Sequence, residues 1–262
     1  MDKRQQIEAL AQSDEDKILL ARVYDRILGA EQKNIPAATC FLTEREQVLA
    51  ERLLRGTEPR FFGGREGAER AVCCYIPDYL DADEWLHGDD GPVCALRAEF
   101  SERESLTHRD FLGSLMGSGI KRETVGDILV GEGSCDLLVT REISPYVLDN
   151  LISAGRVKLS VREIALDELA APEEKFRELR DTVATTRLDS IVSSGFGLAR
   201  AKAAALVESG KVSVNALPCV KPDRLLTEGD RVTARGLGRL ELAAVGGTTK
   251  KGRTGVVIRR FA

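Results

Sequence analysis

Two stretches near the start of the chain carry apolar residues at helical spacing. In the first, residues 14–29, the apolar side chains recur on one helix face and Gly29 marks a stop. The second begins at Thr43, which stands three residues before Glu46 in the spacing of a capping box. These patterns predict a helical N-terminal subdomain over residues 1–60.

The middle of the chain alternates between strand and helix patterns. Strands are expected at 71–76, 93–100, 126–130, 135–140 and 157–164, and helices over 107–116 and from Ser144-Pro145 to about Gly155. A Gly-Glu-Gly-Ser turn joins the third and fourth strands as a hairpin. From residue 93 onward the order is strand, helix, strand, strand, helix, strand, as in ferredoxin-like and RRM-like domains. We therefore expect an α+β protein in which residues 61–165 form a βαββαβ domain.

The last third of the chain follows a charged, lightly apolar segment, residues 166–184, which we interpret as a helical linker. Residues 185–262 then form a separate domain. It opens with two short helices, 187–198 and 198–209, each with one apolar stripe that includes small alanines in the second helix.

The remainder of this domain has strand patterns. Gly210 ends the second helix, and residues 211–215 alternate so that their valines face inward. Further strands are expected at 231–234, after a Glu-Gly-Asp turn, and at 256–260.

The charge of the chain is unevenly distributed. The 262 residues carry a net charge of −4, yet residues 181–262 hold 14 Lys and Arg against 7 Asp and Glu, a net of +7. Residues 1–180 hold 24 basic and 35 acidic residues, a net of −11. Such asymmetry is typical of a basic module that binds a polyanion, but a solvated cationic face without a partner explains it equally well.

The sequence offers little to hold a metal or a cofactor. It has six scattered cysteines without a Cys-x-x-Cys pair and only two histidines, so we expect reduced thiols, no metal site and no cofactor. The N-terminus lacks the apolar core of a signal peptide, and no apolar run is long enough to span a membrane. We expect a cytoplasmic protein that contacts no membrane.

No catalytic constellation emerges from the titratable residues. The glycine-rich loop 63–67 precedes a strand, whereas phosphate-cradling loops follow a strand and open a helix, so a structural turn is expected. We predict no enzyme and no small-molecule substrate. One alternative is an RNA-modifying enzyme, because Arg187-Leu188-Asp189 resembles the aspartate segment of pseudouridine synthases, although only 73 residues follow Asp189. Another is a cell-division adaptor that binds proteins through the middle domain.

Cations of the C-terminal domain lie off its apolar stripes. They are Arg187, Arg200, Lys202 and Lys211, followed by Lys221, Arg224, Arg231, Arg235, Arg239, Lys250, Lys251 and Arg253. The guanidinium group presents a planar fork that matches phosphate oxygens. Apart from Phe196, no exposed aromatic residue is expected for base stacking, so recognition should depend on the backbone and shape of structured RNA.

The motif of the helix pair is similar to that of the S4 RNA-binding domain. The run R-L-D-x5-G-x4-R-x2-A-x2-L-V-x2-G-x-V-x-V-N, then Gly229-Asp230 and R-G-x-G from Arg235, covers about residues 185–240. Two positions depart from the usual motif, because Ala199 replaces a frequent serine and Ala216 replaces a frequent glycine. The first change removes a hydroxyl group and the second alters a turn, but neither removes a cation.

Upstream segments extend the resemblance to the bacterial YlmH family of S4 proteins. They are FFGGREGAER at 61–70, HRDFLGSLMGSGIKRETVGDI at 108–128 and NLISAGRVKLSV at 150–161. The likeness implies a helical N-terminus, an RRM-like middle domain and a C-terminal S4 domain. It also implies binding to ribosomal RNA, to tRNA or to both on the large ribosomal subunit, in the rescue of stalled nascent chains.

The resemblance also implies roles for individual residues. RNA contact is expected at Arg187, Arg200, Lys202, Lys211, Asn215 and Arg235. Independently of the resemblance, Arg109, Lys121 and Arg122 of the middle domain are candidates for phosphate contact, with ordinary solvated charges as the alternative. Structural roles within the S4 motif are expected for Asp189, Gly210, Gly229 and Asp230. The strands 126–130 and 135–140 carry no aromatic residues, so the sheet of the middle domain is expected to be a packing or protein-contact surface.

Overall fold

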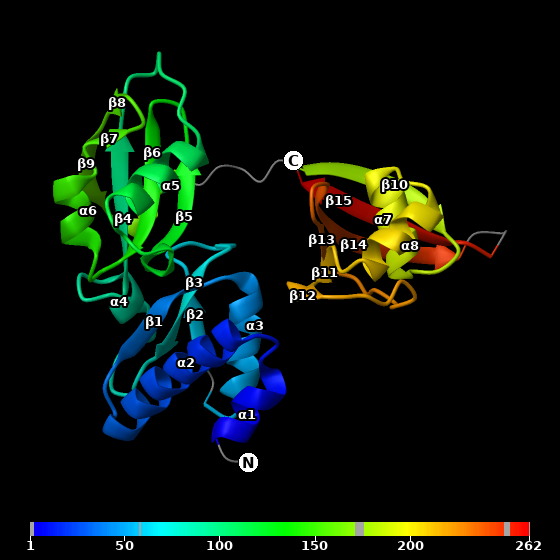
Figure 1. Cartoon of the computed structure of the whole chain (residues 1–262), viewed down its shortest axis with the longest axis horizontal. Coiled ribbons are helices and arrows are strands. Elements are labelled where there is room, and N and C mark those ends of the chain that lie inside the picture. Colours follow the sequence, from blue (N-terminus) through cyan, green and yellow to red (C-terminus); the bar gives the residue numbers. More distant parts are fainter. Residues whose placement is uncertain (1–2, 58, 171–175, 249–251, 262) are drawn as a thin grey trace. The chain divides into compact units, whose positions relative to one another are not determined.

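The computed structural model describes residues 3–57, 59–170, 176–248 and 252–261. The chain divides into two compact units, Met1–Pro172 and Glu173–Ala262 (Figure 1). Both units combine helices with antiparallel sheets, so the α+β class expected from the sequence is confirmed.

The first unit begins with three helices and a small sheet. The helices are α1 (Lys3–Leu10), α2 (Asp14–Lys33) and α3 (Glu44–Leu53), and the antiparallel strands, in the order β1-β3-β2, are β1 (Ala37–Leu42), β2 (Arg60–Phe62) and β3 (Ala71–Tyr75). Ile27 of α2 and Ala50 of α3 pack with Leu42 of β1 and Cys73 of β3 in one buried cluster. Thr43 caps α3 in a capping box: its hydroxyl oxygen accepts from the N–H of Glu46 at 3.4 Å, and the Glu46 carboxylate accepts from the N–H of Thr43 at 2.7 Å.

The expectation of a wholly helical N-terminus is therefore wrong. Residues 37–42 form a strand, and its partner β3 lies beyond the predicted boundary at residue 60. The run AATCFL is too short for a helix and lies between Pro36 and the cap residue Thr43. Residues 37–42 form a strand because they pair with the distant strand β3. Such a pairing cannot be recognised from the spacing of apolar residues within the segment.

The second part of the first unit has the strand and helix order expected from the sequence. Its main elements are β4 (Val93–Glu99), α5 (His108–Gly117), β5 (Val125–Val130), β6 (Ser134–Thr140), α6 (Ser144–Asn150) and β9 (Ser160–Ile164). The strands form an antiparallel sheet in the order β5-β6-β4-β9. Helices α5 and α6 cover one face, where Phe111, Leu115 and Val147 pack on Leu96 and Leu137.

Short elements complete this unit. They are α4 (Ala82–His87), the 3-10 turns η1 (Arg122–Thr124) and η2 (Leu166–Glu168), and the hairpin of β7 (Ser153–Ala154) and β8 (Val157–Lys158). The helix expected to continue to Gly155 ends at Asn150, since Gly155 has a φ of 58° and turns the hairpin. Ser144 was expected to cap that helix, but Ile143 stands at the cap position and Ser144 is buried.

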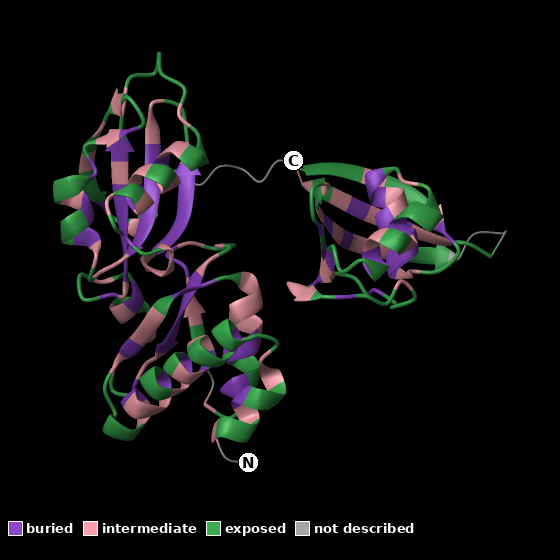
Figure 2. Cartoon of the chain, viewed as in Figure 1, coloured by how far each residue is buried: buried purple, intermediate pink, exposed green. Residues whose placement is uncertain are grey.

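The face of the four-stranded sheet opposite α5 and α6 is also covered. Phe41 of β1 and Val72 of β3 pack against Ala95 of β4 and Leu138 of β6, and Figure 2 shows buried positions along these strands. The approach is close enough that a Cβ on Gly126 would lie 2.6 Å from the ring of Phe41. The expectation of a packing surface is confirmed for this face.

The glycine-rich loop 63–67 is a structural turn, as expected. Gly64 has a φ of 83°, which favours glycine. The buried carboxylate of Asp127 on β5 accepts hydrogen bonds from the backbone N–H groups of Glu69 and Arg70, each at 3.1 Å, and from Arg65 at 3.0 Å. These bonds fasten the loop to the four-stranded sheet.

The second unit is a helix pair on a six-stranded sheet. The helices are α7 (Leu188–Phe196) and α8 (Arg200–Glu208), and the strands are β10 (Phe176–Val183), β11 (Val212–Val214), β12 (Leu217–Pro218), β13 (Arg231–Ala234), β14 (Gly238–Thr248) and β15 (Thr254–Phe261). The sheet is antiparallel in the order β10-β15-β14-β13-β11-β12. The expected stripes are confirmed, because Ile191 and Val207 are fully buried against Val214 and Ile258.

Residues 176–183 form strand β10 and not the expected helix. All eight residues pair with β15, so this segment belongs to the second unit and the linker prediction is wrong there. Only Leu179 and Val183 of β10 pack in the core, while most of its other residues are exposed. The charged residues of this edge strand discourage pairing with other chains. The same residues make the segment difficult to recognise as a strand from the sequence. Residues 171–175 of the expected linker lie outside the described part.

In the described part of the chain, no helix is long and apolar enough to cross a membrane.

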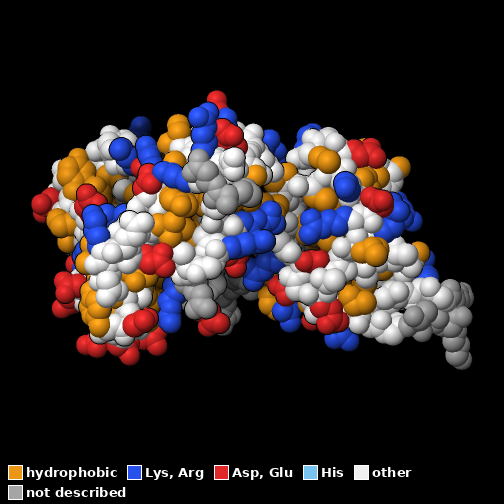
Figure 3. Space-filling model, turned by 90° about the horizontal axis from the view of Figure 1, so that it is seen from below, with side chains coloured by type: hydrophobic (Ala, Val, Ile, Leu, Met, Phe, Trp, Pro, Cys, Tyr) orange, Lys and Arg blue, Asp and Glu red, His pale blue; other side chains and the backbone are white. Residues whose placement is uncertain are grey.

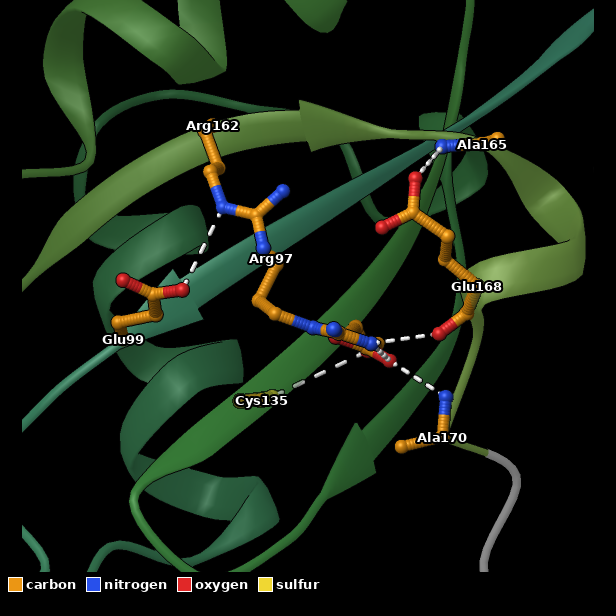
Figure 4. A network of polar contacts seen from close by, with 8 residues as sticks. Arg97, Glu99, Cys135, Arg162, Ala165, Glu168 and Ala170 are labelled. Carbon is orange, nitrogen blue, oxygen red and sulfur yellow. Dashed lines mark hydrogen bonds and ion pairs between the residues drawn. The ribbon is translucent and has the colours of Figure 1, made fainter.

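One buried ion pair ties the four-stranded sheet to the segment that follows it. Arg97 of β4 donates to both carboxylate oxygens of Asp136 on β6, at 2.7 and 2.8 Å, and to the carbonyl oxygen of Glu168 at 2.7 Å (Figure 4). Asp136 is 1% exposed and also accepts from the N–H of Ala170 at 2.8 Å. The pair therefore holds the last described residues of this unit against the sheet.

We expect Asp136→Asn to lower the free energy of unfolding of the first unit by about 3 kcal/mol, since it leaves the guanidinium group of Arg97 without its anionic partner in a buried site. Urea unfolding followed by fluorescence measures this, because the single tryptophan, Trp85, lies in this unit. The matched control is Glu99→Gln, whose exposed pair with Arg162 should contribute no more than about 0.5 kcal/mol. Equal effects of the two substitutions would contradict the assignment.

Candidate functional site

The start of α7 is organised around the carboxylate of Asp189. Arg187 donates from Nε and Nη2 to the two carboxylate oxygens, each at 3.1 Å. Arg200, at the start of α8, reaches the same carboxylate at 3.3 and 3.5 Å, and the Ser190 hydroxyl donates to it at 3.3 Å. Asp189 is only 4% exposed. Its buried carboxylate therefore connects the start of α7 to the start of α8 through these hydrogen bonds.

The two guanidinium groups determine the charge state of this carboxylate. Burial raises the pKa of Asp189, but the hydrogen bonds from Arg187 and Arg200 outweigh burial and leave the pKa below its usual value. Asp189 is therefore ionised at neutral pH and neutralises part of the charge of both arginines. The structural role expected for Asp189 fits this geometry.

Backbone hydrogen bonds also hold the start of α7 in place. The N–H of Leu188 donates to the carbonyl oxygen of Arg224 at 2.8 Å, and that of Asp189 donates to Pro222 at 3.0 Å. The N–H of Leu226 donates to Thr186 at 2.9 Å. The loop after β12 thus satisfies N–H groups at the start of α7 that have no partner within the helix.

A second group of cations has no partner within the described residues. Lys202, Lys211 and Arg235 are exposed, and no hydrogen bond or ion pair among the described side chains engages their charged groups. Lys211 follows the C-cap of α8, where Gly210 at a φ of 71° lets the N–H of Lys211 donate to the carbonyl oxygen of Leu206 at 3.3 Å. The N–H of Arg235 donates to the carbonyl oxygen of Lys211 at 2.9 Å, so these two cations share one end of the sheet.

The second unit holds further cations of this kind. Lys221, Arg224 and Arg231 are described residues whose charged groups likewise lack a described partner. Figure 3 shows Lys and Arg side chains interspersed with acidic ones on the face that it presents. Lys250 and Lys251, which the sequence also indicated, lie outside the described residues.

Asn215 is held by bonds within the protein. Its amide nitrogen donates to the carboxylate of Asp230 at 2.7 Å, and its side-chain oxygen accepts from the N–H of Arg231 at 2.9 Å. Asp230 also accepts from the N–H of Thr227 at 2.7 Å, and Gly229 turns the chain at a φ of 84°. The structure thus gives Asn215 a role in joining two turns, and its expected RNA contact stays a prediction.

The turn between β11 and β12 has a backbone conformation that one of its two central residues, Ala216, disfavours. Asn215 and Ala216 both have positive φ, 49° and 63°, which a type I′ turn requires of its two central residues. Asparagine tolerates this region, whereas alanine is strained there. This gives a physical meaning to the replacement of a frequent glycine by Ala216.

The three cations expected to act in the first unit differ in their surroundings. Arg109 on α5 and Lys121 before η1 are exposed. Arg122 is half-buried and donates to the carbonyl oxygens of Val125 and Gly126, and burial lowers the pKa of its guanidinium group. The geometry therefore leaves Arg109 and Lys121 available to a ligand and gives Arg122 a structural bond.

A groove of about 1190 Å³ lies between α2, β1 and residues 140–142 of the first unit. Its arginines are engaged, since Arg26 donates to Ala38 at 3.0 Å and Arg141 to Glu163 at 2.6 Å. Acidic residues also line it, so the groove does not match a polyanion.

The cysteines are free thiols, as expected, and all but Cys40 are buried. Burial raises the pKa of Cys73 to about 12. Among the described residues no group of His, Cys, Asp or Glu is arranged to hold a metal ion.

A helix pair on an antiparallel sheet, with cations around the helix starts and the sheet end, defines an S4-type unit. The family model of the S4 domain matches residues 186–232. A second family model, described as "Putative RNA-binding domain in YlmH", matches residues 97–168, which are β4 to η2 of the first unit.

A curated relative covers most of the chain. The "Ribosome-associated protein quality control protein P2" of Bacillus subtilis (strain 168) is 33% identical over 225 residues, which are 85% of this chain and 86% of that protein. The chain belongs to the YlmH family of S4-domain proteins. Among solved structures, "Cell division protein ylmH from Streptococcus pneumoniae" is 23% identical with a TM-score of 0.49, over 62% of this chain and 98% of that one.

We expect Ala216→Gly to stabilise the second unit by roughly 0.5 kcal/mol, because relief of the left-handed strain exceeds the added entropy of the unfolded chain. Calorimetry measures this, since all Trp and Tyr residues lie in the first unit. Ala201→Gly, at an exposed position within α8, is the control and should destabilise the unit by about 1 kcal/mol. A loss of stability in both variants would contradict the strain at Ala216.

We expect Asp189→Asn to destabilise the second unit by about 2 kcal/mol at neutral pH, through the loss of its charged hydrogen bonds. Because the folded-state pKa of Asp189 is lowered, this contribution is present above the unfolded pKa of about 4 and is lost as pH falls through the folded pKa. Thermal unfolding from pH 7 downward, monitored by circular dichroism, should therefore show the two proteins converging in acid. A constant difference across this range would rule out the ionised carboxylate as the cause.

Proposed function

We propose that this protein binds structured RNA (ribosomal RNA, tRNA or both) on the large ribosomal subunit in the cytoplasm, and that it acts without catalysis in the quality control of stalled nascent chains. One observation carries the proposal: Lys202, Lys211 and Arg235 are exposed beside the helix pair of an S4 domain, and their charges have no described partner. The name of the Bacillus subtilis relative supports ribosome association and quality control.

The cations are suited to phosphate groups in two ways. Lys202, Lys211 and Arg235 can neutralise phosphates without breaking a described ion pair, so each contact releases counterions at little cost. Arg187 and Arg200 are held by Asp189, which keeps their guanidinium groups in fixed positions where their remaining N–H donors can meet a phosphate. We propose that the first group supplies affinity and that the second positions the RNA.

We further propose that β4 to β9 form a ferredoxin-like, RRM-like domain. The sheet order β9-β4-β6-β5 and the helices α5 and α6 support this. Because the sheet face opposite these helices is buried by β1 and β3, RNA contact in this domain would involve Arg109 and Lys121 at its exposed surface instead.

The alternative of an RNA-modifying enzyme needs an accessible aspartate. Asp189 is 4% exposed, and its oxygens accept hydrogen bonds from Arg187, Arg200 and Ser190. A nucleophile or base must reach its substrate, so this geometry favours a binding protein. The adaptor alternative predicts co-purification of a protein partner that survives nuclease treatment.

We expect the triple variant Lys202→Ala, Lys211→Ala, Arg235→Ala to bind large ribosomal subunits at least about ten-fold more weakly, because three phosphate contacts are lost. In filter binding across a salt series, the slope of log affinity against log salt should fall by about 2.

The control is Lys158→Ala, an exposed lysine of the first unit, which should leave both values unchanged. Circular dichroism checks that the triple variant folds. An unchanged salt slope in a folded triple variant would refute the assignment of the surface.

A further inference from the structure

The six-stranded sheet has a second face that the helix pair does not cover. Leu179, Ile258 and Leu240 pack with α7 and α8 in the core. Because side chains alternate along a strand, the residues between them point to the opposite face. Within the described residues of this unit, no helix packs on that face (Figure 1).

Two phenylalanines lie side by side on this outer face. Phe176 of β10 and Phe261 of β15 are directly paired across the strands, and their ring centroids are 6.1 Å apart. Phe176 is 48% exposed, although its strand is otherwise mostly charged. Phe196, the one aromatic residue that the sequence suggested for stacking, is 8% exposed and lies under Arg260.

Arginines surround this pair. The guanidinium carbon of Arg259 lies 5.1 Å from the ring centroid of Phe176, and that of Arg239 lies 5.6 Å from the ring centroid of Phe261. The Nε of Arg259 is buried without a hydrogen-bond partner among the described groups. We call Phe176, Phe261, Arg239 and Arg259 the aromatic platform.

The platform is continuous with the cations of the S4 site. Arg239 is the cross-strand partner of Thr233 on β13, Arg231 lies on the same face of that strand, and Arg235 stands in the turn that joins β13 to β14. The outer face also holds Arg180, against the acidic residues Glu178 and Glu241, so cations outnumber anions there. A surface of this charge is complementary to a polyanion.

We propose that the aromatic platform binds an unpaired nucleotide of the RNA, with its base stacked on Phe176 and Phe261 and its phosphate beside Arg239. Exposed aromatic rings next to arginines are the usual means of holding unstacked bases, since every base has a π-face. The inference rests on the proposed RNA binding and adds a contact of a different kind. The helix pair would hold backbone phosphates, and the platform would select a junction where a strand leaves a duplex.

The test compares two RNA probes with the full-length protein. One is a hairpin without unpaired ends, and the other is the same hairpin with a single-stranded tail. The tail should raise the affinity of the unaltered protein by about ten-fold, the size of one stacked base. Phe176→Leu, which keeps apolar volume but removes the ring, should abolish most of this gain and leave hairpin affinity unchanged.

Three further variants make the outcome decisive. Phe176→Trp keeps a ring and should retain the preference for the tailed RNA. Tyr79→Leu, which removes an exposed ring from the first unit, should also retain it. The triple variant at Lys202, Lys211 and Arg235 should weaken binding to both probes.

The failures are distinguishable. If the unaltered protein binds the hairpin without preferring the tail, or if folded Phe176→Leu keeps the preference, the platform proposal is overturned while RNA binding stands. If neither probe binds at any salt concentration, the proposed function itself is overturned.

Discussion

The carboxylate of Asp189 lies where two helices and a loop must meet, and the geometry of the second unit depends on it. It takes hydrogen bonds from Arg187 before α7 and from Arg200 at the start of α8. A buried anion between two cations is costly to leave unpaired, so the three groups fix one another. The same constraint divides the cations of the surface into two groups: Arg187 and Arg200 pair with Asp189, whereas the charged groups of Lys202 and Lys211 have no partner among the described residues.

In the first unit, the main constraint is the burial of both faces of the four-stranded sheet. A four-stranded antiparallel sheet with helices on one face leaves the other face apolar, and that face must be buried or used. Here Phe41 and Val72 bury it, and the pair of Arg97 and Asp136 closes the remaining end with residues 168–170. The first unit is thus one body with a shared core, and its interior sheet face is not free for RNA.

Local patterns predicted the parts of the fold that local chemistry determines. The capping residue Thr43, the hairpin at 131–134 and the stripe of Ile191 and Val192 all involve neighbours in sequence, and each was found as expected. Strands β1 and β10 were missed because distant partners decide them, and β10 is too charged to look like a strand. The cations of the site were visible in sequence, but their pairing with Asp189 was not, and neither was the pairing of Phe176 with Phe261, which are adjacent only through the sheet.

The order of strands in the second unit has a consequence for how the chain is made. Strand β15, which follows the other described strands of this unit along the chain, is an interior strand that lies between β14 and β10. Until β15 emerges, β10 lacks a paired neighbour, because β15 is the one described strand that pairs with it. Chains fold from their N-terminus as they are synthesised, so the first unit can form early, whereas the sheet beneath α7 and α8 closes only after β15 has been synthesised. A copy of this protein whose translation stopped before β15 would itself be an incomplete product, in which β10 lacks the strand that it pairs with.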